Sequence, residues 1–404
     1  MVFYAQQPGA MVKKVRLSEV FRWSGGDSLH RFFGCQHVLS GFVVFGSLVL
    51  ALVCFSCSDR FENVDRYFTT ADFTQRSTLH GSRLELGTLL APANIFVHDS
   101  LFFVAGIALR NNVSVFKRGK TYTKVGEIIP TGQGPDEMQS VVKMSFDKGE
   151  IFWARDLVSG SLKQFALYVR DDSVFTERLR SIFLPMPGFN VFFLQDHRIG
   201  VTTPDIQPLK RFYVYDTTGT RLGEFGDYPV LKREIPPTAM VEVYNGWVGV
   251  HPDKQKFALC YEFTDLVEFY DSGFNLLTRV HGPHQFFPEF DLKDRGGAPV
   301  MVRRYNKTKF AYQHIECTDR FVYMLYDNGE TVSKETSHVD DHYSTLVVLD
   351  WQGNPCALYQ LDHPIITFCV DEQRGILFGL DRNESEVYTF PFYLPPSTAA
   401  EVAQ

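Results

Sequence analysis

The segment Phe212-Tyr-Val-Tyr-Asp-Thr-Thr-Gly219 joins a run of aromatic and β-branched residues to a polar turn that ends in glycine. Aromatic and β-branched side chains favour β-strands. Asp and Gly favour the tight turn that follows, because both tolerate the left-handed backbone that such a turn requires. The segment therefore predicts a strand that turns directly into the next strand of a β-hairpin.

This strand-and-turn unit recurs along the chain. Copies occupy 113–119, 266–273 and 346–353, and another copy at 162–172 has Asp171-Asp172 in place of the glycine. Successive turns at 119, 171, 219, 273 and 353 are separated by 52, 48, 54 and 80 residues. The last interval holds one unit plus an insertion, which we place at about 281–307, where the composition is that of a loop.

Each unit also has an earlier strand pair, as at 95–104 and 192–201. Four short strands in about 50 residues predict one blade of a β-propeller. The sixth unit, at 365–392, stops after its third strand, and the alternating run at 79–90 supplies the missing outer strand. The sequence thus predicts an all-β fold, a six-bladed β-propeller of four-stranded antiparallel blades over 79–394 followed by a tail at 395–404. Five and seven blades are the alternatives.

The apolar run at 38–56 has basic residues upstream, ends at Ser56-Cys57 and is followed by the polar Ser58-Asp59-Arg60. This order is typical of a bacterial lipoprotein signal. We expect 1–56 to be a signal segment, Cys57 to be the lipidated residue and 57–78 to be a tether. Phe55 departs from the strict motif because it is bulky.

The same run is long enough to cross a bilayer as a helix, so a transmembrane anchor is the alternative. Because the basic residues precede the run, both interpretations place the rest of the chain outside the cytoplasm. We expect a lipid anchor in the cell envelope, at the outer rather than the inner membrane.

Charge narrows the range of partners. The whole chain has a formal net charge of −7. Residues 1–56 carry five basic and two acidic side chains, so the part from Cys57 onward is −10 (−7 minus 3). An acidic domain without a Lys/Arg run argues against a nucleic-acid partner, because phosphate binding needs clustered positive charge.

Four cysteines lie in the predicted propeller, at positions 260, 317, 356 and 369, and none has the spacing of a zinc or haem site. Disulfides and buried free thiols both remain open. Trp153 and Trp247 lie within predicted strands and are expected in the core.

The loop Thr131-Gly-Gln-Gly-Pro-Asp-Glu-Met138 follows the outer strand of the first predicted blade. It resembles the Gly-x-Gly-Pro-x-Glu signature of the TolB-like or NHL-like six-bladed propeller lipoproteins of Bacteroidetes. Together with the blade rhythm, this resemblance covers most of 79–394. It implies a binding or scaffold role at the cell envelope rather than a reaction.

Two loops offer candidate ligand-binding residues. Gln133, Asp136 and Glu137 are expected at the mouth of the central channel, where propellers often bind ligands. His281 and His284 follow the outer strand of blade four as the Gly-Pro loop follows that of blade one. For both loops, a purely structural connection between blades is the alternative.

Metal chemistry is considered at two places. His338, Asp341 and His342 have metal-like spacing in a polar insertion. A calcium ion in the channel would need oxygen ligands from several blades, for which the candidates are Asn94, Asn190, Asn245 and Glu242. No other cofactor is expected.

The chain has no Gly-x-Ser-x-Gly elbow, His-Glu-x-x-His motif, P-loop or dinucleotide fingerprint. This favours a non-catalytic propeller that binds a protein, a small molecule or a glycan. The alternative is a calcium-dependent lactonase or esterase with its site in the channel. A third hypothesis is a bridging role in an envelope complex through the insertion at 281–307.

Overall fold

The computed structural model describes residues 60–393, apart from gaps at 107–109, 148, 171, 185–188, 203–208, 232, 330–342 and 382–383. The chain divides into two units, 1–58 and 59–404, and the described residues belong to the second. The predicted signal segment, Cys57, the tail 395–404 and the candidate metal ligands His338, Asp341 and His342 lie outside the described residues.

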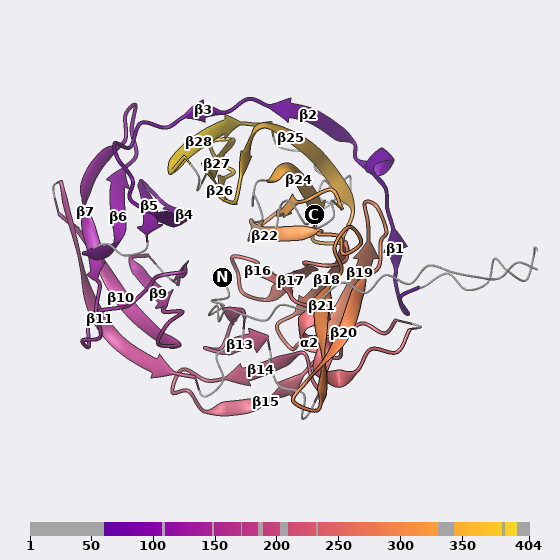
Figure 1. Cartoon of the computed structure of the whole chain (residues 1–404). Coiled ribbons are helices and arrows are strands. Elements are labelled where there is room, and N and C mark those ends of the chain that lie inside the picture. The colour runs from indigo at the N-terminus through magenta and orange to yellow at the C-terminus, as the bar shows by residue number, and fades with distance from the viewer. Residues whose placement is uncertain are drawn as a thin grey trace, which may run out of the picture. The chain divides into compact units, whose positions relative to one another are not determined.

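Within the second unit, six sheets surround a common centre (Figure 1). Blade 1 contains β4 (Pro92–His98), β5 (Leu101–Gly106), β6 (Asn111–Lys117) and β7 (Thr123–Pro130). Blade 2 contains β8 (Lys143–Phe146), β9 (Ile151–Arg155), β10 (Ser161–Arg170) and β11 (Ser173–Phe183). Blade 3 contains β12 (Val191–Phe193), β13 (Ile199–Thr202), β14 (Phe212–Tyr215) and β15 (Arg221–Phe225).

The other three blades follow the same antiparallel order. Blade 4 contains β16 (Gly246–Val250), β17 (Lys256–Tyr261), β18 (Leu266–Asp271) and β19 (Leu276–His281). Blade 5 contains β22 (Tyr312–Cys317), β23 (Phe321–Tyr326), β24 (Tyr343–Asp350) and β25 (Pro355–Ile365). Blade 6 contains β26 (Thr367–Asp371), β27 (Ile376–Asp381), β28 (Glu386–Pro391) and the early strand β3 (Ser82–Arg83). The six-bladed all-β propeller is therefore confirmed.

The recurring turns join the third and fourth strands of their blades, as predicted. Gly219 and Gly353 have φ angles of +86° and +75°. At Gly353 an added Cβ would lie 2.7 Å from a methyl carbon of Val280, so both the backbone and the packing require glycine.

The core lies between neighbouring blades. Strands β5 and β23 are buried over their whole length. Between blades 3 and 4, Phe192, Phe212 and Phe257 form a buried aromatic cluster, with ring centroids 4.9 to 6.1 Å apart. Aromatic side chains fill such interfaces well because of their large apolar area.

The N-terminal segment of the described residues closes the ring. β3 pairs antiparallel with β28 and completes blade 6, which confirms the expected strand donation. β1 (Arg66–Tyr67) pairs parallel with β19, and β2 (Gln75–Leu79) pairs parallel with β25. A short 3-10 helix, η1 (Thr70–Asp72), lies between them. We call residues 60–83 the strap, because they run along the outer edges of blades 4, 5 and 6 (Figure 1).

The strap corrects the expectation of a tether at 57–78. Within its described part, Phe61, Phe68, Phe73 and Leu79 are at most 5% exposed. Their spacing follows neither a helix nor a strand, so the sequence shows no periodic signal, yet each side chain packs into a hydrophobic cluster with residues of the blades. From Phe61 onward, the segment is part of the propeller.

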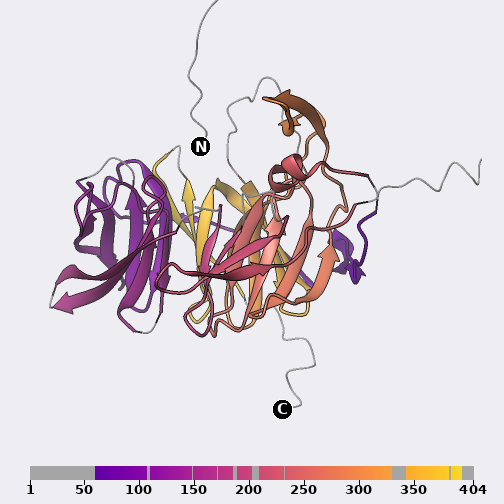
Figure 2. The same ribbon diagram turned by 90° about the horizontal axis from the view of Figure 1, so that it is seen from below.

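The insertion at 281–307 also differs from its prediction as a loop. It contains the hairpin β20 (Phe290–Arg295) and β21 (Ala298–Arg303), which projects from one face of the disc beside α2 (Pro237–Val243) (Figure 2). The Glu242 carboxylate accepts a hydrogen bond from the backbone N–H of Met301 (3.0 Å) and ties the hairpin to the helix. Phe286, in the same insertion, is buried in a hydrophobic cluster with residues of blades 4 and 5.

The structure also places the cysteines and two of the tryptophans of the predicted propeller. Cys260, Cys317 and Cys369 are free thiols, and Cys356 is buried. Trp153 is 3% exposed and belongs to the core, whereas Trp247 is 38% exposed and its expected burial is wrong. Trp247 lies on the inner strand β16, where its ring is 6.3 Å from that of His314. None of the helices in the described part of the chain has the length and apolar character needed to cross a membrane.

We predict that Phe68→Ala lowers the free energy of unfolding by about 3 kcal/mol, because the side chain is 1% exposed and its loss leaves a cavity under the strap. Chemical denaturation measures the change. Arg76→Ala on the exposed part of β2 is the matched control and should change stability by less than about 0.5 kcal/mol. Equal effects of the two substitutions would contradict the role of Phe68 as an anchor.

Candidate functional site

The Gly132–Glu137 loop is held by the outer strands of blade 2. The Lys163 ammonium on β10 donates to the carbonyl oxygens of Gly134 (3.2 Å), Pro135 (3.0 Å) and Glu137. Arg178 on β11 donates from Nε to Asp136 Oδ1 (2.8 Å). The Glu137 carboxylate turns back and accepts from the N–H of Gly134 (2.9 Å).

These contacts correct the expected position of the loop. Asp136 pairs with a residue of the outermost strand, so this loop locks blade 1 to the rim of blade 2 rather than lining the ring centre. Gln133 is exposed. As a ligand-binding group, each of the three predicted residues stays a prediction, but the structure uses Asp136 and Glu137 to hold the loop.

The loop after β19 is organised by the fully buried carboxylate of Asp265. It accepts hydrogen bonds from three successive backbone N–H groups, those of His284 (2.6 Å), Gln285 (2.7 Å) and Phe286 (3.0 Å). His281 Nε2 lies 3.0 Å from the same carboxylate. A buried carboxylate needs this number of donors to offset its lost hydration.

The two histidines differ in their surroundings. His284 is exposed, and its Nδ1 lies 2.9 Å from the hydroxyl of Tyr326. The side chain of His281 is completely buried, and its Nδ1 has no hydrogen-bond partner. Because Nε2 faces two acceptors, Asp265 Oδ1 and the carbonyl oxygen of Phe286 (3.1 Å), Nε2 carries the proton. In the neutral ring, Nδ1 is therefore an acceptor without a donor.

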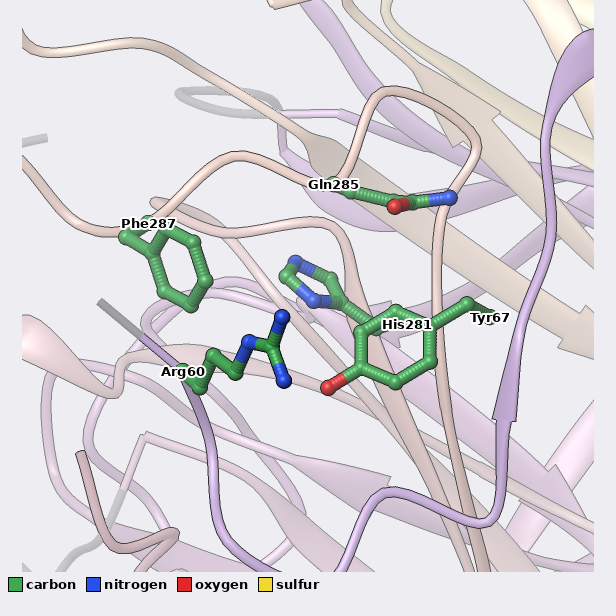
Figure 3. A pocket seen from close by; sticks show the side chains of 5 residues that line it. All are labelled: Arg60, Tyr67, His281, Gln285 and Phe287. Atoms are coloured by element: carbon green, nitrogen blue, oxygen red, sulfur yellow. The ribbon is translucent and has the colours of Figure 1, made fainter. Parts of the chain in front are cut away.

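His281 lines a pocket of about 440 Å³ between the strap and the loop after β19. We call it the strap pocket. In Figure 3 the His281 ring lies between Arg60 and Gln285, with Phe287 and Tyr67 on either side. These five residues line the pocket, and none of them is acidic. The arrangement offers a guanidinium, an unpaired acceptor and two aromatic walls to a small molecule.

Sequence reasoning selected His281 but expected it near the channel. The structure places it at the rim, because β19 is an outer strand and Tyr67 on β1 pairs with it. The prediction did not include Arg60 or Tyr67, since a polar tether offers no signal that its side chains will meet those of a residue more than 200 positions away.

The inner strands carry a second polar group of residues. Thr367 donates to Asn94 Oδ1 (2.9 Å), and its hydroxyl is 3.4 Å from His314 Nε2, which in turn is 3.3 Å from Glu316. Lys143 donates to the carbonyl oxygen of Val248 (3.4 Å) and so joins the inner strands of blades 2 and 4. Alternate polar positions on β22 are the signal that would have identified His314 and Glu316.

The candidate calcium ligands have separate structural partners. Asn94 donates to the carbonyl oxygen of Val142 (3.0 Å), and Asn190 donates to that of Gly246 (2.7 Å), so each connects its blade to the next. Asn245 donates to Glu262 (2.7 Å), and Glu242 holds the β20–β21 hairpin. Asn94 alone joins the polar group on the inner strands described above.

Comparison with known proteins places the fold. The family described as TolB-like 6-blade propeller-like matches residues 89–373. The chain belongs to the TolB-like six-bladed propeller family. No curated protein matches this TolB-like propeller.

Two solved structures illustrate the range of similar folds. A member of the DUF4221 family from Bacteroides vulgatus is 11% identical with a TM-score of 0.51, and the match covers 78% of this TolB-like propeller chain and 96% of that chain. An exported protein of Bacteroides fragilis, described as putative in its own name, is 12% identical with a TM-score of 0.46, and the match covers 80% and 98% of the two chains. At such identities the likeness concerns the fold alone.

One group in the described part of the TolB-like propeller has side chains close enough to share a metal ion. His363, Asp381 and Glu384 place one ligand atom each within 4.8 Å of the others. His363 Nε2 is 3.1 Å from Asp381 and 3.8 Å from Glu384, and its ring stacks on Tyr388. The sequence analysis missed the group because its first member belongs to blade 5 and the other two to blade 6.

The desolvation of Lys143 predicts how the stability of the protein depends on pH. Desolvation lowers the pKa of the Lys143 ammonium, and the Glu316 carboxylate acts in the opposite direction. Between the lowered folded pKa and the unfolded value of about 10.4, the unfolded chain binds more protons, so stability rises with pH and is lost as pH falls through the folded pKa. We expect Lys143→Met to raise the free energy of unfolding at pH 7 by on the order of 1 kcal/mol.

Urea denaturation across the alkaline range tests this expectation. Between the lowered pKa of Lys143 and about 10.4, the free energy of unfolding of the wild type should rise more steeply with pH than that of the Lys143→Met variant. Lys256→Met, at an edge of β17 where the ammonium lies 5.0 Å from the Trp351 ring, is the control for the loss of one charge. An unchanged pH profile would contradict the desolvation of Lys143.

Proposed function

We propose that this protein is an exported, membrane-anchored and non-catalytic scaffold that binds a small ligand in the strap pocket. The observation that carries the proposal is His281 Nδ1, a buried acceptor without a donor in a pocket that also contains the Arg60 guanidinium. A buried polar atom without a hydrogen-bond partner is destabilising. A ligand that supplies the missing donor would remove this cost, so such an atom in a pocket favours a bound ligand.

The lining suggests the chemical class of that ligand. Arg60 favours a carboxylate, because a planar guanidinium donates two parallel hydrogen bonds to one. His281 Nδ1 requires a donor, such as a hydroxyl. Tyr67 and Phe287 flank these groups with aromatic surface. A hydroxy acid or a sugar acid carries both functional groups and fits the absence of acidic side chains among the five lining residues.

The lipid anchor remains part of the proposal and rests on the sequence. Cys57 precedes Arg60 by three residues, which span at most about 11 Å when extended. Because Phe61 is packed into the propeller, lipidation of Cys57 would hold the rim with the strap pocket close to the membrane. A ligand at that pocket would then be bound near the membrane surface.

We expect that hydroxy acids or sugar acids bind the full-length protein, and that Arg60→Met weakens the affinity by about tenfold or more through loss of a charge-assisted contact. His281→Gln should weaken it as well, because the glutamine amide can still donate to Asp265 but offers no ring nitrogen. Isothermal titration calorimetry with the acids, their esters and their deoxy analogues measures these effects.

Arg76→Met, on the same strap but not among the residues lining the pocket, is the control for the charge change. Binding to the esters as tight as to the acids would contradict the role of Arg60. Failure of all the acids to bind would overturn the proposed ligand class.

The anchor has its own test. In cells grown with labelled palmitate, the wild-type protein should be labelled and should sediment with membranes, whereas Cys57→Ser should be unlabelled. Cys54→Ser, in the same segment, is the matched control and should behave as the wild type. A labelled Cys57→Ser protein would show that the anchor is wrongly assigned.

A further inference from the structure

A second pocket, of about 530 Å³, lies on the other side of Phe61. The Phe61 ring is 5.2 Å from Phe287 of the strap pocket and 6.4 Å from Tyr244 of the second pocket. The second pocket is built by the segment between β15 and α2, with contributions from α2 and the strap. We call it the α2 pocket. Its lining residues include Glu62, Tyr228, Leu231, Arg233, Glu234 and Tyr244.

Unpaired polar atoms are concentrated around the α2 pocket. The Tyr244 hydroxyl and Arg233 Nε are buried and make no hydrogen bond within the described part of the chain, whereas the Tyr228 hydroxyl lies beside the Arg211 guanidinium. Tyr244 is completely buried, and Tyr228 is 6% exposed. Buried polar groups are normally satisfied, so two such atoms around one cavity indicate that a bound molecule supplies their partners.

The surrounding structure holds these groups in place. Arg211, which is 2% exposed, lies over the Tyr228 ring at 4.9 Å and donates from Nη2 to the carbonyl oxygen of Tyr244 (2.6 Å). Arg233 donates from Nη2 to the carbonyl oxygen of Pro288 and lies over the Phe290 ring at 4.7 Å. The Nε atom of Arg233 takes part in neither contact and is available to a ligand. The two tyrosine rings are 6.0 Å apart.

The lining carries more carboxylates than cations, because Glu62, Asp227 and Glu234 stand against one guanidinium, that of Arg233. Arg233 Nε and the tyrosine hydroxyls are donors, whereas Glu62 and Glu234 bring carboxylate acceptors. Asp227 is already paired with Lys210 (2.6 Å). Leu231, Ile235 and Met240 add apolar surface. The excess of carboxylates disfavours an anion, so a ligand for this lining carries both donors and acceptors, an apolar face and no negative charge.

We propose that the α2 pocket binds a neutral saccharide of one or two rings. Sugar hydroxyls donate and accept, and the C–H faces of a sugar ring pack against aromatic side chains. The volume of the pocket lies within the range of small-molecule sites. This inference is independent of the acid proposed for the strap pocket, because Phe61 separates the two cavities and their linings share no residue.

Removal of single hydroxyl groups tests the proposal. A panel of uncharged monosaccharides and disaccharides is titrated calorimetrically into the full-length protein, and the affinity of the tightest is compared between variants. Tyr244→Phe should weaken that affinity by about tenfold. Arg233→Lys, which keeps the charge but removes Nε, should weaken it similarly. Arg60→Met in the strap pocket should leave saccharide binding unchanged.

A second measurement separates a ligand contact from a structural one. If the ligand supplies the partner of the Tyr244 hydroxyl, Tyr244→Phe should leave the melting temperature of the unliganded protein unchanged or raise it. Tyr270→Phe is the matched control, because the Tyr270 hydroxyl donates to buried Glu268 (2.8 Å) and its loss should lower the melting temperature. A similar loss in Tyr244→Phe would overturn the proposal.

The titrations with saccharides can also overturn the proposal for the α2 pocket. Failure of every saccharide in the panel to bind at millimolar concentration would exclude the proposed ligand class. If Arg60→Met abolishes saccharide binding whereas Tyr244→Phe and Arg233→Lys leave it intact, the sugar binds in the strap pocket instead. Neither result depends on whether a hydroxy acid binds.

Discussion

Closure of the ring is the constraint on which the rest of this structure depends. The outer strand of a propeller blade is an edge, and unpaired backbone groups at edges invite pairing with other chains. The strap covers the outer strands of blades 4 and 5 through β1 and β2, and β3 is itself the outer strand of blade 6. The first residues of the described chain are thereby joined to its last blade.

A buried charge connects the strap to the interior. Glu268, which is completely buried, accepts from Arg279 Nε (2.7 Å), from Tyr261 (2.5 Å) and from Tyr270 (2.8 Å). Arg279 also donates from Nη1 to the backbone carbonyl oxygen of Glu62 in the strap (2.8 Å). The ion pair lies within blade 4 and fixes the Arg279 guanidinium, so release of the strap would leave a buried donor of this guanidinium without its acceptor. Arg279 thereby connects the buried charge of blade 4 to the strap segment beside both pockets.

Blade rhythm was predictable because it is local. Each hairpin needs only alternating side chains and a turn residue such as Gly219 or Gly353, and both properties are visible within about ten residues. The donation of the run at 79–90 followed from the missing strand of blade 6. The hairpin β20–β21 was missed because its Arg- and Gly-rich sequence has the composition of a loop, although Glu242 and the helix α2 stabilise it as strands.

The candidate sites, unlike the blades, depend on contacts between segments that are distant in the sequence. His281 was selected from its place after an outer strand, but only the tertiary structure brought it together with Arg60 and Tyr67, since β1 pairs with β19 across more than 200 residues. The α2 pocket had no signal at all, because Tyr228 and Tyr244 are ordinary core residues by type and Arg233 is an ordinary surface residue by type. The sequence by itself determined the all-β blade pattern and the order of the blades, which depend on local patterns, and it favoured six blades over five or seven. The tertiary structure decided which polar atoms were buried without partners, because that depends on packing between distant segments.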